Sequence, residues 1–413
     1  MFADAFASDP TALGWMVGSP PPADRLVRFE DGSFFRFPQW RWSFSHWREL
    51  VPTVNVARGS GPVSLLPNME RPELDAVMFV PLGGTRPMSW AASLAANYTD
   101  GIVVLHKGRI VYQRYFGALT PERPHIAFSV TKSFFGTIAA TLIAECTLDP
   151  HATVAHYIPE LRAGGFADAT VREVLDMTAA LKYSEHYGDA SSDITSYSRA
   201  AGYLPRPPDY AGPRSDYEYL ATVPKDGEHG AAFTYRSINT SVLGWLIART
   251  TGKPLHQVLQ ERIWSRLGAE HDSYLHVDSN GTAQAAGGLN AQLRDVARFG
   301  EMIRLGGRYN GEQIVPTDVL EDIRAGGNRA AFAKADYPTL PGWSYRNQWW
   351  VSHNRHGAFM ARGIHGQAIY VDPKAEMVVA RFASHPLASN VNIDPTSLPA
   401  YEAVAAHLLA HAD

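Results

Sequence analysis

The sequence has a single cysteine, Cys146, among its 413 residues, so no disulfide can form within the chain. Cys146 follows an apolar segment, which favours a small buried core residue. The sequence also lacks any run of the roughly 18 apolar residues that a membrane-spanning helix needs, and its N-terminus lacks the charged start and apolar run of a signal peptide. We therefore expect a cytoplasmic protein without a membrane partner.

An excess of positive charge is missing as well. The chain carries 37 Lys and Arg against 41 Asp and Glu, a formal net charge of -4, and the basic residues form no run. Binding to the phosphate backbone of a nucleic acid requires a basic surface. The sequence therefore excludes a nucleic-acid partner. A small molecule is the expected partner, and whether two copies form a homodimer is left open.

The chain has the composition of a folded globular protein, with 45% hydrophobic and 19% charged residues. Residues 1–95 are rich in Pro, Trp and Phe and carry few periodic segments, which predicts an extension packed on the main body. Residues 101–117 predict two strands around a turn, and residues 130–145 predict a helix. Most periodic segments from 150 to 285 indicate helices.

Two further strands are predicted around the turn Asp372-Pro373-Lys374, and a closing helix over 399–412. The order of strands, helices, strands and helix favours an α+β fold, in which an antiparallel sheet flanked by helices is interrupted by a mostly helical insertion. We expect a sheet domain formed by 96–150 and 280–413 and a helical domain formed by 151–279.

One short motif, Ser-x-x-Lys at residues 129–132, contains residues that could be catalytic. Ser129 and Lys132 lie three residues apart at the start of the helix predicted over 130–145, so both side chains share one face. A serine hydroxyl is a weak nucleophile until a neighbouring base takes its proton, and a helix N-terminus favours a developing oxyanion. The alternative is an ordinary polar pair. Lys132 is the single charge in an apolar helix, where an unpaired ammonium is costly, and this favours catalysis.

Two later segments complete a pattern. "FTYRSINTSVLGWLI" contains Tyr235, Ser237 and Asn239, and "ARGIHGQAIYVDP" places a glycine-flanked turn before a strand. With "TLDPHATVAHYIPEL" and "AAGGLNAQLRDVARFGEMIRLGGRYNGEQIV", these blocks resemble the serine β-lactamase-like hydrolases, in the branch of class C β-lactamases, DD-peptidases and esterases. "WRWSFSHWRELVP" and "RNQWW" resemble the nylon-oligomer hydrolases within that family. The resemblance implies a β-lactamase/penicillin-binding-protein-like fold.

The resemblance also implies roles for individual residues. Ser129 is the nucleophile, Lys132 is the base, and Tyr235 passes a proton to the leaving group. The oxyanion hole consists of the backbone N–H groups of Ser129 and Ile364. No cofactor is implied.

Four residues are expected to line the substrate cleft: Tyr187, Trp350, His365 and Ser198. Since neighbouring residues of a strand point to opposite faces, only one tryptophan of the pair at 349–350 should face the cleft. Ser198 stands where nylon-oligomer hydrolases can carry an acidic residue, and Ala286 replaces a larger polar one. The Lys-Thr-Gly run of true β-lactamases is absent, which removes the cation that would hold a β-lactam carboxylate.

The histidines at 353, 356 and 365 lack the spacing of a metal-binding helix and have no acidic cluster beside them, so no metal is expected. The predicted function is hydrolysis of small linear amides or short-chain carboxylic esters through an acyl-enzyme. Three alternatives stay open: a D-aminopeptidase or DD-peptidase, a weak β-lactamase, and a non-catalytic protein that keeps the fold.

Overall fold

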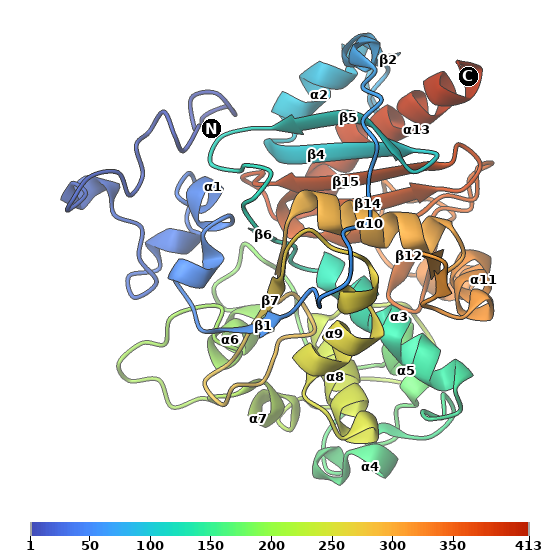
Figure 1. Ribbon diagram of the computed structural model, residues 1–413. Helices are drawn as coiled ribbons and strands as arrows, with labels where there is room; N and C mark the ends of the chain where they lie inside the picture. The colour runs from blue at the N-terminus through green and yellow to red at the C-terminus, as the bar shows by residue number, and fades with distance from the viewer. Residues whose placement is uncertain (1, 412–413) are drawn as a thin grey trace.

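A computed structural model describes residues 2–411. Its centre is a seven-stranded antiparallel sheet in which the early strand β4 pairs with the late strand β15 (Figure 1). This confirms the predicted sheet, whose first and last strands come together. Across the sheet the strands are β11 (Ser344–Arg346), β12 (Trp349–Val351), β13 (Phe359–Gly363), β14 (Gln367–Asp372), β15 (Met377–Ala383), β4 (Thr99–His106) and β5 (Arg109–Tyr115).

Helices cover both faces of this sheet, because the strands are apolar on both sides. On β4, Val103 and Leu105 belong to the core beneath α10, whereas Ile102 and Val104 belong to the core beneath α2 and α13. Figure 1 shows α2 and α13 above the sheet and α10 below it. The bounds of these helices are α2 (Trp90–Ala96), α10 (Leu293–Arg304) and α13 (Asp394–Ala410).

A mostly helical region follows α3 in the chain and lies below the sheet in Figure 1. The long buried helix α8 packs against α3 and carries apolar or small residues on nearly every side. The helices are α3 (Val130–Ala144), α4 (Val154–Tyr157), α5 (Val171–Leu175), α6 (Asp193–Ala200), α7 (Asp216–Leu220), α8 (Ser237–Thr251) and α9 (Leu255–Arg262). The contact between α3 and α8 brings two distant parts of the sequence to one point.

The remaining elements are short. A four-stranded sheet in the order β1-β7-β8-β6 ties the N-terminal segment to the rest of the molecule, since β1 pairs with β7. The elements are α1 (Trp40–Ser43), β1 (Thr53–Val56), β2 (Met78–Phe79), β3 (Met88–Ser89), β6 (His125–Ile126), β7 (Ser273–His276), β8 (Leu289–Ala291), β9 (Arg308–Tyr309), β10 (Glu312–Gln313), α11 (Thr317–Ala325) and α12 (Arg329–Phe332). The division of the chain into domains stays a prediction.

The N-terminal segment packs its aromatic side chains against the start of α3. Phe34, Phe44 and Trp47 are fully buried and share a core with Phe128, the residue before Ser129. Burial of several aromatic rings is a large favourable term. This segment is therefore one wall of the region around Ser129.

The closing helix begins at Asp394, five residues before the predicted start at Pro399. A proline inside a helix leaves one backbone carbonyl without its intrahelical donor. Here the carbonyl of Pro395 accepts a hydrogen bond of 3.0 Å from the backbone N–H of Leu82. The N-terminal segment thus satisfies the group that Pro399 leaves free, and the helix continues through it.

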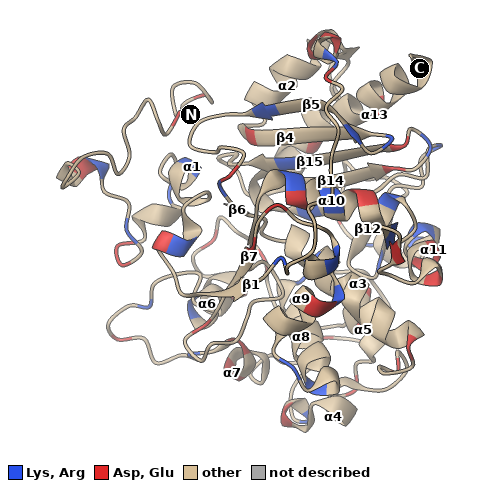
Figure 2. Ribbon diagram, in the orientation of Figure 1, with Lys and Arg blue, Asp and Glu red and all other residues tan. Residues whose placement is uncertain are grey.

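The prediction that Cys146 is a core residue is wrong. Helix α3 ends at Ala144, and Cys146 lies exposed in the following turn with a left-handed backbone (φ +56°). The helix therefore ends one residue before the predicted end at residue 145, and the chain turns away from the core. Among residues 2–411, no helix is both long and apolar enough to cross a membrane. Charged side chains of both signs are distributed over many elements, as Figure 2 shows.

Arg41 holds the N-terminal segment through a buried set of contacts. Its guanidinium pairs with Asp100 at 3.4 Å and donates to Ser384 Oγ (3.1 Å), Ser8 Oγ (2.9 Å) and the carbonyl of Ala5 (2.5 Å). Both members of the ion pair are almost completely buried. Removing one partner of such a pair leaves an uncompensated charge.

Arg41→Met is expected to lower the free energy of unfolding by about 3 kcal/mol, because Asp100 then stays buried without its cation. The measurement is the midpoint of urea unfolding. The matched control is Arg36→Met, since Arg36 lies exposed in the same segment, and it should shift the midpoint little. Equal effects of the two substitutions would contradict the role of Arg41.

Candidate active site

Ser129 lies at the N-terminus of α3, directly after a strained residue. Phe128 has a left-handed backbone (φ +42°), which is unfavourable for a bulky side chain. Its ring packs edge-on against Phe44 and Trp47, at centroid distances of 4.9 and 6.0 Å. The aromatic core therefore holds a turn that the local sequence alone would not favour, and this turn presents Ser129 at the helix terminus.

Lys132 is buried, with 1% of its surface exposed, and its amine contacts only neutral oxygen atoms. Nζ lies 2.9 Å from Ser129 Oγ, 3.1 Å from Ser237 Oγ and 2.5 Å from the carbonyl of Ala286. Burial lowers the pKa of Lys132 from 10.5 to about 8, and the negative charge of Glu185 opposes this shift. The uncharged amine that a base requires is therefore far more populated near neutral pH than in an exposed lysine.

Tyr235 approaches the pair from the loop before α8. Its ring centroid lies 5.3 Å from Lys132 Nζ, and its hydroxyl interacts with the side chain of Ser129. Burial raises the pKa of Tyr235 well above its usual value, Glu185 raises it further, and the contact with Ser129 partly offsets both. The phenol is therefore protonated and able to donate a proton.

Ile364 follows β13 in a tight turn that lies against the backbone before Ser129. A side chain at Gly363 would place a Cβ 2.8 Å from the carbonyl oxygen of Ala127, so only glycine allows this approach. His365 in the same turn has a left-handed backbone (φ +61°). Ser129 and Ile364 border one cavity. The N–H groups of Val130, Thr131 and Lys132 already donate to the backbone carbonyls of residues 127–129.

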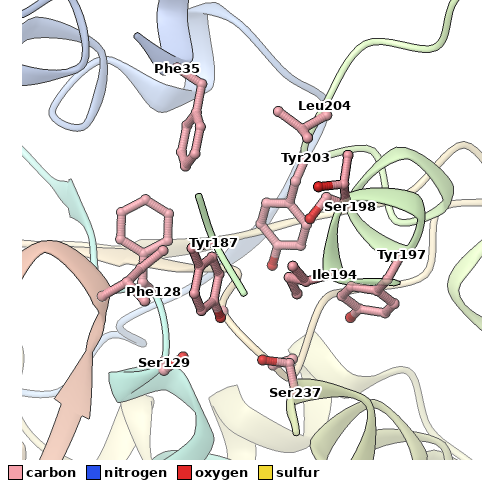
Figure 3. A pocket seen from close by; sticks show the side chains of 14 residues that line it. Phe35, Phe128, Ser129, Tyr187, Ile194, Tyr197, Ser198, Tyr203, Leu204 and Ser237 are labelled. Carbon is pink, nitrogen blue, oxygen red and sulfur yellow. The ribbon is translucent and has the colours of Figure 1, made fainter. Parts of the chain in front are cut away.

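Two cavities meet at Ser129. The smaller, of about 170 Å³, is shown in Figure 3, where Phe35 and Phe128 face Tyr203 and Leu204 across the space. The larger, of about 820 Å³, carries more polar side chains. The smaller is lined by Phe35, Phe128, Ser129, Tyr187, Ile194, Thr195, Tyr197, Ser198, Tyr203, Leu204, Ser237, Ala286, Gly287 and Ile364, and the larger includes Ser129, Glu185, Tyr187, Tyr235, Trp350, Arg362, Ile364 and His365.

The four residues predicted to contact substrate all border these cavities. Tyr187 lines both, Ser198 lines the smaller, and Trp350 lines the larger. His365 also lines the larger cavity, but its ring is buried among aromatic side chains and its Nδ1 lies 2.7 Å from the carbonyl of His385. His365 is thus placed to fix the turn that carries Ile364.

The two adjacent tryptophans point to opposite sides of β12. Trp350 stacks on Tyr235, with ring centroids 5.4 Å apart. Trp349 is fully buried on the other face, where its indole N–H donates to Thr137 Oγ1 at 3.1 Å. Only Trp350 faces the cavity, as the alternation of strand residues requires.

Sequence reasoning missed Glu185. Its carboxylate accepts hydrogen bonds from the backbone N–H and the hydroxyl of Ser237, at 2.5 and 2.7 Å, and from the hydroxyl of Tyr187 at 2.6 Å. A chain of contacts therefore runs from Lys132 through Ser237 to Glu185. Glu185 lies in the segment "YSEHYGD" beside Tyr187, but nothing in its spacing relates it to Lys132.

Arg362 was missed as well, although it directly precedes Gly363. Its side chain lines the larger cavity and pairs with Asp394 at 2.5 Å. Arg362 therefore supplies a cation near this turn, although the lysine of a Lys-Thr-Gly run is absent. No group of three or more His, Cys, Asp or Glu side chains within 2–411 is arranged to hold a metal ion.

The fold and the arrangement of Ser129, Lys132 and Tyr235 are typical of one family of enzymes. The Beta-lactamase family model matches residues 92–396, about three quarters of the chain, and the chain belongs to this family. It is a serine hydrolase with a β-lactamase/penicillin-binding-protein-like fold, which confirms the predicted fold class, resemblance and enzyme class.

Within that class, the chain is similar to the 6-aminohexanoate-dimer hydrolase of Paenarthrobacter ureafaciens, with 34% identity over 350 residues that cover 84% of this chain and 86% of the relative. A solved structure from Bacillus anthracis, provisionally named a 6-aminohexanoate-dimer hydrolase, superimposes with a TM-score of 0.85 at 33% identity and covers 96% of this chain and 100% of its own. EstCE1, a hydrolase with promiscuous acyltransferase activity, shares the fold, with a TM-score of 0.58 at 16% identity over 76% of this chain and 98% of its own.

The pKa of Lys132 makes the pH dependence of activity testable. An amine that must be uncharged gains activity as pH rises, so kcat/KM should increase about tenfold per pH unit below about 8 and then level off. Glu185→Gln removes the charge that raises this pKa, and the rise should therefore move to lower pH. The measurement is the pH profile of kcat/KM for a neutral ester.

Glu228→Gln is the matched control, because Glu228 is exposed and its variant should keep the wild-type profile. A profile of Glu185→Gln that stays in place or moves to higher pH would rule out this electrostatic coupling.

Proposed function

We propose that Ser129, Lys132 and Tyr235 form the catalytic group of a hydrolase that cleaves small linear amides and short-chain carboxylic esters through an acyl-enzyme. The observation that carries this proposal is the 2.9 Å contact between Lys132 Nζ and Ser129 Oγ, in a site where the lysine is fully buried and meets only uncharged oxygen atoms. The reaction requires no cofactor.

The uncharged amine of Lys132 accepts the proton of Ser129 as Oγ attacks the carbonyl carbon of the substrate. The oxyanion of the tetrahedral intermediate accepts hydrogen bonds from the backbone N–H groups of Ser129 and Ile364. As the carbon–nitrogen or carbon–oxygen bond breaks, Tyr235 donates its proton to the leaving group and regains one from the Lys132 ammonium. Water then attacks the acyl-enzyme by the reverse sequence and releases the acid.

The two cavities separate the two halves of the substrate. Tyr235 must reach the leaving group, and it lines only the larger cavity. The leaving group therefore occupies the larger cavity, and the acyl group occupies the smaller one. The residues of the smaller cavity carry no formal charge, so the acyl group that fits it is short and uncharged.

The choice between an amide and an ester as the preferred substrate depends on Ser198. The name of the Paenarthrobacter relative supports a linear amide whose acyl half ends in an amine. Such an ammonium would enter the smaller cavity, where Ser198 offers only a hydroxyl. We therefore propose that esters and amides with uncharged acyl groups are better substrates than the 6-aminohexanoate dimer.

None of the described contacts favours a D-aminopeptidase, a DD-peptidase or a weak β-lactamase over this function. A non-catalytic protein with the same fold would have no reason to keep Lys132 buried beside Ser129 and Tyr235, since burial of an amine is unfavourable. The cytoplasmic location stays a prediction, and whether two copies form a homodimer stays open.

Ser129→Ala and Lys132→Met should each lower kcat for p-nitrophenyl acetate by at least 10³-fold, because the first removes the nucleophile and the second removes its base. The matched controls are Ser191→Ala and Lys182→Met, which change exposed residues of the same types. Stopped-flow absorbance would also show whether an acyl-enzyme accumulates. Wild-type rates in Ser129→Ala would refute the proposed mechanism.

Ser198→Asp tests the assignment of the smaller cavity. A carboxylate there should attract an ammonium, so cleavage of the 6-aminohexanoate dimer should rise at least fivefold relative to p-nitrophenyl butyrate. Chromatography of the released 6-aminohexanoate gives the rate. A substitution to Asn at the same position is the control for size without charge, and an equal gain from Asn would contradict the electrostatic explanation.

A further inference from the structure

The larger cavity contains a buried cation that the proposed reaction does not use. Arg362 is the last residue but one of β13, and only 6% of its surface is exposed. Its side chain borders the same cavity as Ser129, Tyr235 and Trp350. A buried guanidinium normally has every N–H group engaged.

The bonds of Arg362 leave one side of the guanidinium open. Nη2 donates to Asp394 Oδ1 at 2.5 Å, and the guanidinium carbon lies 5.0 Å from the ring centroid of Trp350. Nη1 is buried and has no hydrogen-bond partner within residues 2–411. This unpartnered donor belongs to a side chain that lines the larger cavity.

Arg362 lies on the leaving-group side of the site. The ring of Trp350 contacts both the ring of Tyr235 and the guanidinium of Arg362, so the three side chains form a continuous series. The positive charge of Arg362 also acts on the phenol of Tyr235. A leaving group that takes its proton from Tyr235 and extends past Trp350 would therefore reach Arg362.

Two of the three acidic residues that line this cavity are already engaged in hydrogen bonds. Asp394 binds Arg362 through one oxygen and accepts from Thr339 Oγ1, at 2.6 Å, through the other. Glu185 accepts its three hydrogen bonds from Ser237 and Tyr187. Asp336 is exposed at the rim. The unpartnered group is thus the N–H donor of Arg362, which would bind a hydrogen-bond acceptor on the substrate.

We propose that Arg362 is a specificity-determining residue that binds an oxygen acceptor, a carboxylate or an amide carbonyl, carried by the leaving group. This rests on the proposed function, because it takes the larger cavity as the leaving-group side. It defines the substrate class more narrowly: compounds whose released amine or alcohol carries a second carbonyl function, as in an N-acyl amino acid or in the next unit of a linear oligoamide.

The test compares butyrate esters of three alcohols of equal length that end in a carboxylate, a primary carboxamide or a methyl group. Each kcat/KM is divided by that for phenyl butyrate, which has no such acceptor, so loss of folded enzyme cancels. The wild-type protein should prefer at least one oxygen-bearing ester over the methyl ester by about tenfold or more. Equal values for all three esters would overturn the proposal.

Arg362→Met should reduce this preference to about one, and Arg308→Met, at an exposed position, should keep it. A preference that survives Arg362→Met would also overturn the proposal. The two acceptor types are distinguished by the wild-type data: a carboxylate far better than a carboxamide indicates an anionic end group, and similar values indicate a carbonyl.

Asp394→Asn supplies the second variant, in case Arg362→Met does not fold. Asparagine keeps the size of the side chain and an oxygen for Thr339, but it no longer neutralises Arg362. The ratio of carboxylate to carboxamide ester should therefore rise at least threefold, and an unchanged ratio would refute a free guanidinium donor. Absence of phenyl butyrate hydrolysis in the wild-type protein would instead refute the proposed function.

Discussion

The site depends on the burial of the Lys132 amine next to the Ser129 hydroxyl. Burial disfavours the ammonium, and the three oxygen atoms around Nζ are all uncharged, so nothing in direct contact restores the charge. The apolar helix α3 supplies the burial, and the contact between α3 and α8 supplies Ser237. A lysine in water at the same spacing would be an ammonium and could not act as a base.

The N-terminal segment helps to fix the backbone of the site. Its aromatic rings pack against Phe128 and hold this left-handed residue immediately before Ser129, the proposed nucleophile. Such strain persists only where the surrounding structure over-determines it. On the other side, Gly363 lets the end of β13 approach the same turn, so that Ile364 and Ser129 border one cavity. The backbone of the site is thus fixed from both sides by residues distant in the sequence.

The two cavities differ in the chemistry that they can accept. The smaller one has no charged side chain in its lining, whereas the larger one contains Arg362, Glu185 and Asp394. Because Tyr235 lines only the larger cavity, the proposed direction of the substrate follows from the position of one phenol. The same fold can therefore serve amide or ester chemistry, and the side chains of the two cavities select the substrate.

The sequence by itself determined the pairing of Ser129 with Lys132, because residues three apart on a helix must share a face. It also predicted that the early and late strands of the sheet come together. Tyr235 and Ile364 followed only from family resemblance, since no spacing relates positions a hundred or more residues apart. Only the tertiary structure placed Cys146 in an exposed turn, brought Glu185 to Ser237, and left one N–H of Arg362 open. Those features depend on where helices end and on which distant side chains meet, and both are decided by packing.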